Sequence, residues 1–452
     1  MSEKDETHAD IELDLKRAFE DEEKVRRELE ARIASAEAAL EAGEDADIDS
    51  LAHDYLACAL EAQEDDDFEK MSVWLDKAVK LFDSTDELTD ERVLLLGQVR
   101  LTYGIALNDQ GMWSDALAEY DAAEKLLEKL SGKNLDALLD LAGIRLNIAT
   151  IQFEIGEYDD SMAAFEKVKS DFASLFGTDK ESEAYYYLAK TYLQEAAVCR
   201  EIGDDDKALQ RLEEGIALYR KMLEESDDTE TSVDLANALA TYAECLECSG
   251  AGSDEILPYV EEAVERMQGG IAAGRADVCP DLLNTSVTKG RLLNYLSRSD
   301  DAEMFLTETV EIFEGIRDTE DPSALLCLVT LHNERGKARY ALKRYKDALA
   351  DFDDAADIAG RLPDGFFEED EEDCGCEDDC CCEQHRIMRS EGNLTLFSVY
   401  MHRAKVLKIL NRISEAKIDC RKAGEILPKV KDYLDGDYSG YEEMYNCLLN
   451  NL

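Results

Sequence analysis

Residues 103–127, YGIALNDQGMWSDALAEYDAAEKLL, contain the pattern that decides the fold. Gly104 lies in an apolar helical stretch, and Gly111 follows seven residues later, where a glycine favours the end of a helix and a tight turn. The stretch after this turn places three residues at i, i+4 and i+7 on one helix face: Ala116, Tyr120 and Ala123. The segment therefore predicts two antiparallel helices, packed closely through small residues, with a bulky side chain filling the gap toward the next hairpin.

The same pattern recurs along the chain. The small residues at the first position are Ala59, Gly104, Ala149, Ala196, Ala243, Gly290, Gly336 and Ala404, with successive spacings of 45, 45, 47, 47, 47, 46 and 68 residues. Seven residues after each comes a residue that is mostly of a turn-forming type: Asp66, Gly111, Gly156, Gly203, Gly250, Ser297, Lys343 or Asn411. A fixed period of this kind predicts hairpins that stack on one another.

This pattern resembles the tetratricopeptide repeat family. The clearest units are residues 103–127, residues 147–168 (NIATIQFEIGEYDDSMAAFEKV) and residues 335–358 (RGKARYALKRYKDALADFDDAADI), and the resemblance covers roughly residues 50 to 430. It implies an all-α fold, a right-handed α-solenoid of about eight antiparallel helix hairpins. The family's unit is about 34 residues, so the longer period here predicts helices of about 18 to 20 residues.

The repeat and its flanks predict five regions. Residues 1–45 are expected to form a charged amphipathic capping helix, helical over 10–42, with a coiled-coil dimerisation helix as the alternative. Residues 46–363 are expected to form about seven hairpins, 364–385 an acidic, cysteine-rich inserted loop, and 386–430 the last hairpin. Residues 431–452 are expected to form a C-terminal cap, because the end of a stacked array needs covering.

Composition narrows the class of protein. The formal net charge of the 452 residues is −56, a field that repels nucleic acid and anionic membranes, so we expect neither as a partner. The alternative explanation of the charge is solubility alone. The N-terminus has no signal-peptide pattern and no stretch approaches the roughly 18 apolar residues of a membrane span, which predicts a cytoplasmic protein with reduced cysteines.

The resemblance also suggests where a partner binds. In this family the first helix of each unit lines the concave face, and the residue after the small position often points into that groove. This position becomes basic in the last three units, at Arg291, Lys337 and Lys405. Three residues further on, the expected groove continues with Asn294, Tyr340 and Lys408, while Asn284, Tyr295 and Asn333 lie near it in the alignment. Such a strip predicts a partner protein bound through an acidic or C-terminal peptide segment; the alternative is that these bases only neutralise nearby acids.

The inserted segment offers a second hypothesis. Residues 364–385 contain eleven acids and no base, and the soft ligands Cys374, Cys376, Cys380, Cys381, Cys382 and His385. These residues could hold Zn²⁺ or Cu⁺, although the spacing is not that of a standard zinc site. A thiol redox sensor and a loop without a function are the alternatives, and acidic neighbours argue against a reactive thiolate.

No catalytic motif accompanies these features. The chain has no Gly-rich phosphate loop after a strand and no H-E-x-x-H, and its five histidines do not form a spaced set. We therefore expect a protein-interaction scaffold or adaptor and no enzyme, with metal binding or redox sensing as the alternative function.

Overall fold

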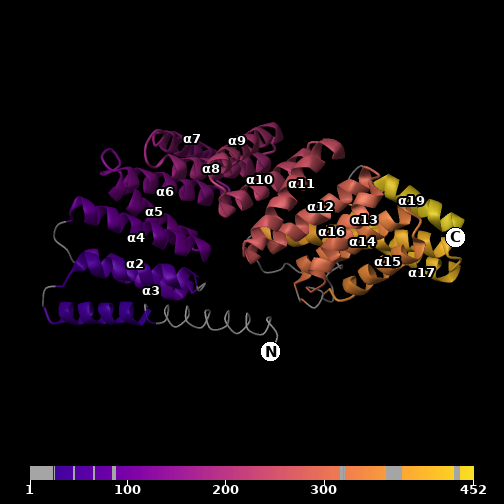
Figure 1. Cartoon of the computed structure of the whole chain (residues 1–452), viewed down its shortest axis with the longest axis horizontal. Helices are drawn as coiled ribbons and strands as arrows, with labels where there is room; N and C mark the ends of the chain where they lie inside the picture. Colours follow the sequence, from indigo (N-terminus) through magenta and orange to yellow (C-terminus); the bar gives the residue numbers. More distant parts are fainter. Residues whose placement is uncertain are drawn as a thin grey trace, which may run out of the picture. The chain divides into compact units, whose positions relative to one another are not determined.

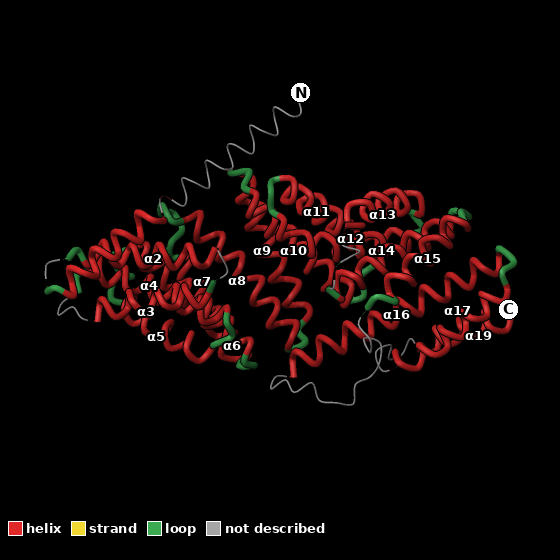
Figure 2. The backbone as a smooth tube through the Cα atoms, turned by 90° about the horizontal axis from the view of Figure 1, so that it is seen from below, coloured by secondary structure: helices red, strands yellow, loops and turns green. Residues whose placement is uncertain are grey.

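The computed structural model describes most of the chain. It covers residues 24–452 except 25, 44–45, 65–66, 84–87, 316–318, 320, 363–378 and 432–437, and it describes only the backbone of residues 379–387. Figure 2 shows helices joined by short connections, and the described residues contain no strand. The prediction of an all-α fold is confirmed.

The described helices form two compact units, residues 1–218 (unit 1) and 219–452 (unit 2) (Figure 1). Unit 1 contains a helix at residues 26–41, followed by the pairs α2 (Ile48–Glu64) and α3 (Phe68–Asp83), α4 (Asp90–Asp109) and α5 (Trp113–Leu127), α6 (Leu135–Glu154) and α7 (Tyr158–Ala173), and α8 (Glu181–Glu201) with the start of α9 (Asp205–Glu225).

Unit 2 continues the same alternation after the end of α9. Its pairs are α10 (Thr229–Cys248) and α11 (Ser253–Ala272), α12 (Cys279–Tyr295) and α13 (Ser299–Phe313), α14 (Pro322–Ala341) and α15 (Tyr345–Ala359), and α16 (Asp379–Ile409) and α17 (Ile413–Ile426). Short 3-10 turns lie at Ala276–Val278 and Leu427–Val430, and α19 (Tyr438–Asn451) ends the chain. The described residues thus contain the eight hairpins that the repeat predicts.

The turn inside each hairpin is set by backbone geometry. Gly111 adopts a φ of 72°, and the N–H of the next residue, Met112, donates to the carbonyl of Leu107 at 2.9 Å, which closes the end of α4. Equivalent bonds close the later turns, where Ser297, Lys343 and Asn411 replace glycine at φ values of 57°, 64° and 61°. The predicted turn position is therefore confirmed even where the residue is not glycine.

The small residues permit close packing within each hairpin. A Cβ added to Gly336 would lie 2.6 Å from the ring of Phe352, and one added to Gly104 would lie 2.3 Å from Tyr120. Each bulky residue therefore covers the small residue of its own hairpin. The bulky residue also faces the next hairpin, as the sequence predicts: the ring of Phe352 stacks on His402 of α16.

The helix lengths also differ from the prediction in part. First helices such as α4 and α6 have the expected 20 residues, whereas second helices such as α5 and α7 have 15 and 16. The rest of the period lies in the connections between hairpins, for example residues 128–134. The estimate of 18 to 20 residues is therefore too long for most second helices.

The structure describes part of the predicted N-terminal helix and one end of the predicted inserted loop. A helix is present at residues 26–41, whereas 10–23 lie outside the described residues. α16 begins at Asp379, so residues 379–385 are helical and the predicted loop is too long at this end.

Candidate functional site

A cavity of about 660 Å³ lies in unit 2 between the first helices of successive hairpins. Residues of α12, α14, α16 and the C-terminal α19 line it. Its apolar lining includes Val287, Leu326, Leu394, Phe397, Tyr441 and Met444, and its polar lining includes Asn284, Arg291, Tyr295, Asn333, Glu334, Lys337, Ser398 and His402. A smaller cavity of about 370 Å³ shares Arg291, Tyr295, Glu334, Lys337 and His402 and adds Asn294 and Tyr340.

Most of the basic and polar residues chosen from the sequence therefore lie together. Arg291 and Lys337 line both cavities, and Asn294 and Tyr340 line the smaller one. Lys405 lies under α19, where its Nζ is 3.8 Å from the Sδ of Met444. Lys408 lies on the last turn of α16 and lines neither cavity.

Two of these cations already have carboxylate partners. Arg291 Nη2 lies 2.7 Å from Glu247 Oε2, and Lys337 Nζ lies 2.6 Å from Glu334 Oε1. Asn294 Nδ2 donates to both the carbonyl and Oε2 of Glu334, each at 2.9 Å. The alternative considered from the sequence, that bases in this strip neutralise neighbouring acids, therefore describes Arg291 and Lys337.

Lys405 differs from these two. Its side chain has no carboxylate partner among the described residues, in a chain with 105 acids. Burial lowers the pKa of Lys405, and the nearby charge of Lys337 lowers it further. Of these two ammonium groups, only Lys337 has a carboxylate partner among the described residues.

His402 also lines both cavities. Its Nδ1 donates to the carbonyl of Ser398 at 2.8 Å, and its ring stacks on Phe352 at 5.9 Å between centroids. Burial, followed by the charges of Lys337 and Lys405, lowers the pKa of His402 to about 3. The imidazole is therefore neutral at physiological pH, with Nε2 as a hydrogen-bond acceptor.

Asn333 supplies another polar group to the cavity wall. Its Nδ2 donates to Ser398 Oγ at 3.2 Å, whereas its buried Oδ1 has no hydrogen-bond partner. A buried acceptor without a partner costs free energy unless a ligand or water donates to it. The cavity thus combines an unpartnered acceptor with an apolar surface, while the unpaired Lys405 lines neither cavity and lies next to the cavity-lining Met444.

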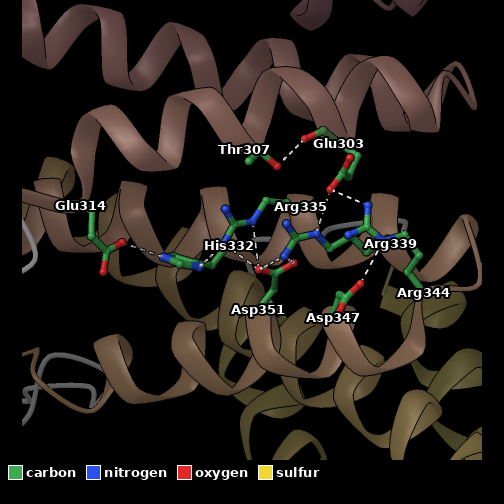
Figure 3. Close-up of polar contacts among 9 residues, drawn as sticks. All are labelled: Glu303, Thr307, Glu314, His332, Arg335, Arg339, Arg344, Asp347 and Asp351. Carbon is green, nitrogen blue, oxygen red and sulfur yellow. Dashed lines mark hydrogen bonds and ion pairs between the residues drawn. The ribbon is translucent and has the colours of Figure 1, made fainter.

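The opposite side of α14 carries a chain of charges. Figure 3 shows Arg335 and Arg339 converging on Asp351 of α15; Arg335 Nη2 lies 2.7 Å and Arg339 Nη1 2.9 Å from Asp351 Oδ1. Arg339 also reaches Glu303 of α13 at 3.1 Å, and His332 Nε2 lies 3.7 Å from Glu314 Oε2. These pairs hold the second helices against α14.

One turn of α14 joins this network to the cavity. Residues 332–335, His-Asn-Glu-Arg, are all buried, and their side chains face four different neighbours: Glu314, Ser398, Asn294 and Asp351. Asn333 and Glu334 face the cavity, while His332 and Arg335 face the charge network. The cavity wall is therefore held in place by polar contacts on several sides.

Sequence reasoning missed two contributors to this site. His402 lies two residues before the small residue Ala404, a position that holds Glu334 and Thr288 in the preceding repeats, and comparing that position would have found all three. Tyr441 and Met444 come from α19, which the sequence predicts only as a cap. Both reach the cavity through nonlocal packing of α19, which leaves no periodic signal in the sequence.

The cysteine-rich segment lies largely outside the description. Cys374 and Cys376 fall among residues that are not described, and Cys380, Cys381, Cys382 and His385 lie in the first two turns of α16. In the part of the chain whose side chains are described, no group of three His, Cys, Asp or Glu could hold a metal ion. The metal site stays a prediction.

Over the described ranges, no helix has the length and apolar character needed to cross a bilayer.

Comparisons with known proteins add similarity of fold. No protein-family model and no curated protein matches the sequence. Among solved structures, the apo form of RapI is 13% identical with a TM-score of 0.49, covering 84% of this chain and 99% of that one. The quorum sensor NprR from B. thuringiensis is 15% identical (TM-score 0.40; 84% and 100% covered), and the S. pombe nuclear import adaptor Nro1 is 13% identical (TM-score 0.45; 61% and 99% covered). The eight hairpins, their turn geometry and their small-residue packing make the fold that of a tetratricopeptide-like α-solenoid.

Proposed function

We propose that this protein is an interaction scaffold whose unit 2 cavity binds a segment of a partner protein through an acidic side chain or a C-terminal carboxylate. The observation that carries the proposal is Lys405, a half-buried ammonium without a carboxylate partner among the described residues, whose Nζ lies 3.8 Å from the Sδ of Met444 in the cavity wall. Holding such a cation is unfavourable unless an anion joins it. A bound carboxylate would supply that anion.

The rest of the cavity suits a peptide. Its volume of about 660 Å³ lies in the range of small-ligand sites and accommodates a few residues. Asn333 Oδ1 can accept from a peptide N–H, and Leu326, Phe397 and Tyr441 offer apolar contact to a side chain. No group in this arrangement needs to act as an acid, a base or a nucleophile for binding.

Peptide binding tests this function. Fluorescence anisotropy would measure a library of short labelled peptides, each with a free and with an amidated C-terminus, against the full chain. We expect peptides with a free carboxylate or acidic residues to bind, and Lys405→Gln to weaken them about tenfold, the loss of one charge-assisted contact.

The matched control is Lys417→Gln on the exposed face of α17, which removes the same charge away from the cavity. It should leave binding unchanged. Equal binding of amidated neutral peptides, or equal losses in the two variants, would contradict the proposed carboxylate contact.

Metal binding by the cysteine-rich segment is kept as the alternative proposal. The four-residue spacing of Cys381 and His385 supports it, because residues four apart share one face of a helix. Its test is given in the Discussion.

A further inference from the structure

The turns inside the hairpins of unit 1 form one edge of that unit. α4 contacts α6, and α6 contacts α8, and a second helix returns the chain between them, so these first helices run the same way and end together. The turns that follow them are residues 109–112, 154–157 and 201–204, and we call these three segments the turn edge.

Each of these first helices ends on an acid. Asp109, Glu154 and Glu201 are the last residues of α4, α6 and α8, all three are exposed, and none has an ion-pair partner among the described residues. A helix dipole is negative at its C-terminal end, so an acid there is repelled by the helix itself. Helix stability therefore does not explain these three acids.

Unit 2 shows that the turn does not require such charge. The residue after the left-handed position is an arginine in its last three hairpins, at Arg298, Arg344 and Arg412, and each pairs with the acid three residues later, at 2.7, 2.9 and 2.6 Å. The equivalent residues in unit 1 are Met112, Glu157 and Asp204. At the positions of Asp109, Glu154 and Glu201 these unit 2 hairpins have no acid, but Tyr295, Ala341 and Ile409. The turn therefore forms without the helix-terminal acids, which have no ion-pair partner among the described residues of unit 1.

A second, independent feature of the turn edge is apolar. Ile155 and Ile202 follow Glu154 and Glu201 directly and are 41% and 50% exposed, and Met112 is 39% exposed. A single exposed isoleucine needs no explanation, but these side chains recur at the turns of successive hairpins, each beside an unpaired acid. A free metal cation could bind the acids but would not contact the exposed isoleucines favourably.

We propose that the turn edge of unit 1 docks a basic, amphipathic segment of a partner protein. Lysine or arginine side chains of the segment would pair with Asp109, Glu154 and Glu201, and its apolar side chains would cover Ile155 and Ile202. Charge complementarity selects this occupant, since an acidic segment or a nucleic acid would be repelled. This surface is separate from the cavity of unit 2 and takes a partner of the opposite charge.

The probe is a short labelled peptide of lysine and leucine arranged as an amphipathic helix, compared with a scrambled peptide of the same composition and with oligo-lysine. Binding to the full chain is measured by anisotropy at low and at high salt. One variant combines Asp109→Asn, Glu154→Gln and Glu201→Gln, and another combines Ile155→Ser and Ile202→Ser. The control triple, Asp83→Asn, Glu91→Gln and Asp179→Asn, removes the same charge from other exposed sites of unit 1.

We expect the edge triple to weaken binding of the amphipathic peptide about tenfold and the control triple to weaken it less than about twofold. The isoleucine pair should weaken the amphipathic peptide and leave oligo-lysine unchanged. No binding by the wild type, equal losses in the two triples, or no loss in the isoleucine pair would overturn the proposal. Thermal unfolding confirms that the variants fold, and the edge triple should melt no lower than the wild type because its acids oppose the helix dipoles.

Discussion

Arg211 on α9 reaches back to Glu195 on α8, with Nε 2.9 Å from Oε1, and the two residues are sixteen positions apart in one hairpin. The same two positions in later hairpins hold Arg335 with Asp351 at 2.7 Å and Arg403 with Asp419 at 2.6 Å, where the charges are exchanged. At the same two positions in another hairpin, the Nζ of Lys289 lies 4.3 Å from the centroid of the Phe305 ring. Four of the eight described hairpins therefore carry their own complementary pair at a common position, which favours the correct partner helix over the others.

Neutralising Glu195 should strongly destabilise unit 1. The side chain of Glu195 is fully buried and also lies 2.7 Å from Lys169, so Glu195→Gln leaves two cations without their shared carboxylate. We expect a loss of about 3 kcal/mol in the free energy of unfolding, measured by urea denaturation. Glu166→Gln is the control, because exposed Glu166 also contacts Lys169, at 2.9 Å, and should cost less than about 1 kcal/mol. Equal losses would contradict the role of burial.

The hairpin architecture was predictable because each hairpin repeats a local pattern. Gly104, Gly111 and Tyr120 specify a close contact, a turn and a filling side chain within one short segment, and the structure places them so. The pair at positions 195 and 211 was not found, because its charges change sign from hairpin to hairpin and a search for a conserved type misses it.

The candidate site was predictable only in outline. Counting from the small residue found Arg291 and Lys337, but their partners Glu247 and Glu334 depend on how neighbouring helices pack. The contribution of α19 depends on a return of the chain after Leu427–Val430, for which the sequence carries no periodic signal. Nonlocal packing therefore limits the prediction.

Glycine at position 336 should be irreplaceable in its hairpin. A Cβ there would lie 2.6 Å from Phe352, whose ring is held on another side by His402, so the ring cannot move aside freely. We expect Gly336→Ala to lower the free energy of unfolding by about 1–3 kcal/mol, with partial recovery when Phe352→Leu is added. Gly143→Ala provides the contrast: nothing lies within 4 Å of its Cβ, and alanine should stabilise α6 by about 0.5–1 kcal/mol.

The cysteine-rich segment makes a prediction about metal content. Native mass spectrometry of the reduced full chain, with and without residues 364–385, would measure bound Zn²⁺ or Cu⁺. If the segment binds metal, the intact chain carries it in a fixed ratio and the deletion does not. Exchanging Cys380, Cys381 and Cys382 for serine should abolish the stoichiometric metal binding, because thiolates are the soft ligands available. An intact chain without stoichiometric metal would contradict the proposal.

His402 should make unit 2 sensitive to acid. Its folded pKa is about 3 against an ordinary 6.5, so the unfolded chain binds the extra proton between these values. The free energy of unfolding therefore rises with pH in this window, by up to about 1.4 kcal/mol per pH unit. Urea denaturation at two pH values inside the window should show that the free energy of unfolding decreases less toward the lower pH for His402→Gln than for the wild type. The exposed His53→Gln should behave like the wild type.

Replacing Lys405 should stabilise the fold and weaken peptide binding. Burial and the neighbouring charge of Lys337 lower its pKa, which shows that the folded state disfavours its charged form. Lys405→Met replaces the ammonium with a thioether next to Met444, so we expect the free energy of unfolding to rise by about 1 kcal/mol. The same variant should lose affinity for peptides with a free carboxylate, since the unpaired cation is gone. Lys417→Met, on the exposed face of α17, should change neither quantity. A variant that is more stable and still binds would contradict the proposed contact between Lys405 and the carboxylate, whereas one that is less stable would show that Lys405 has a structural role.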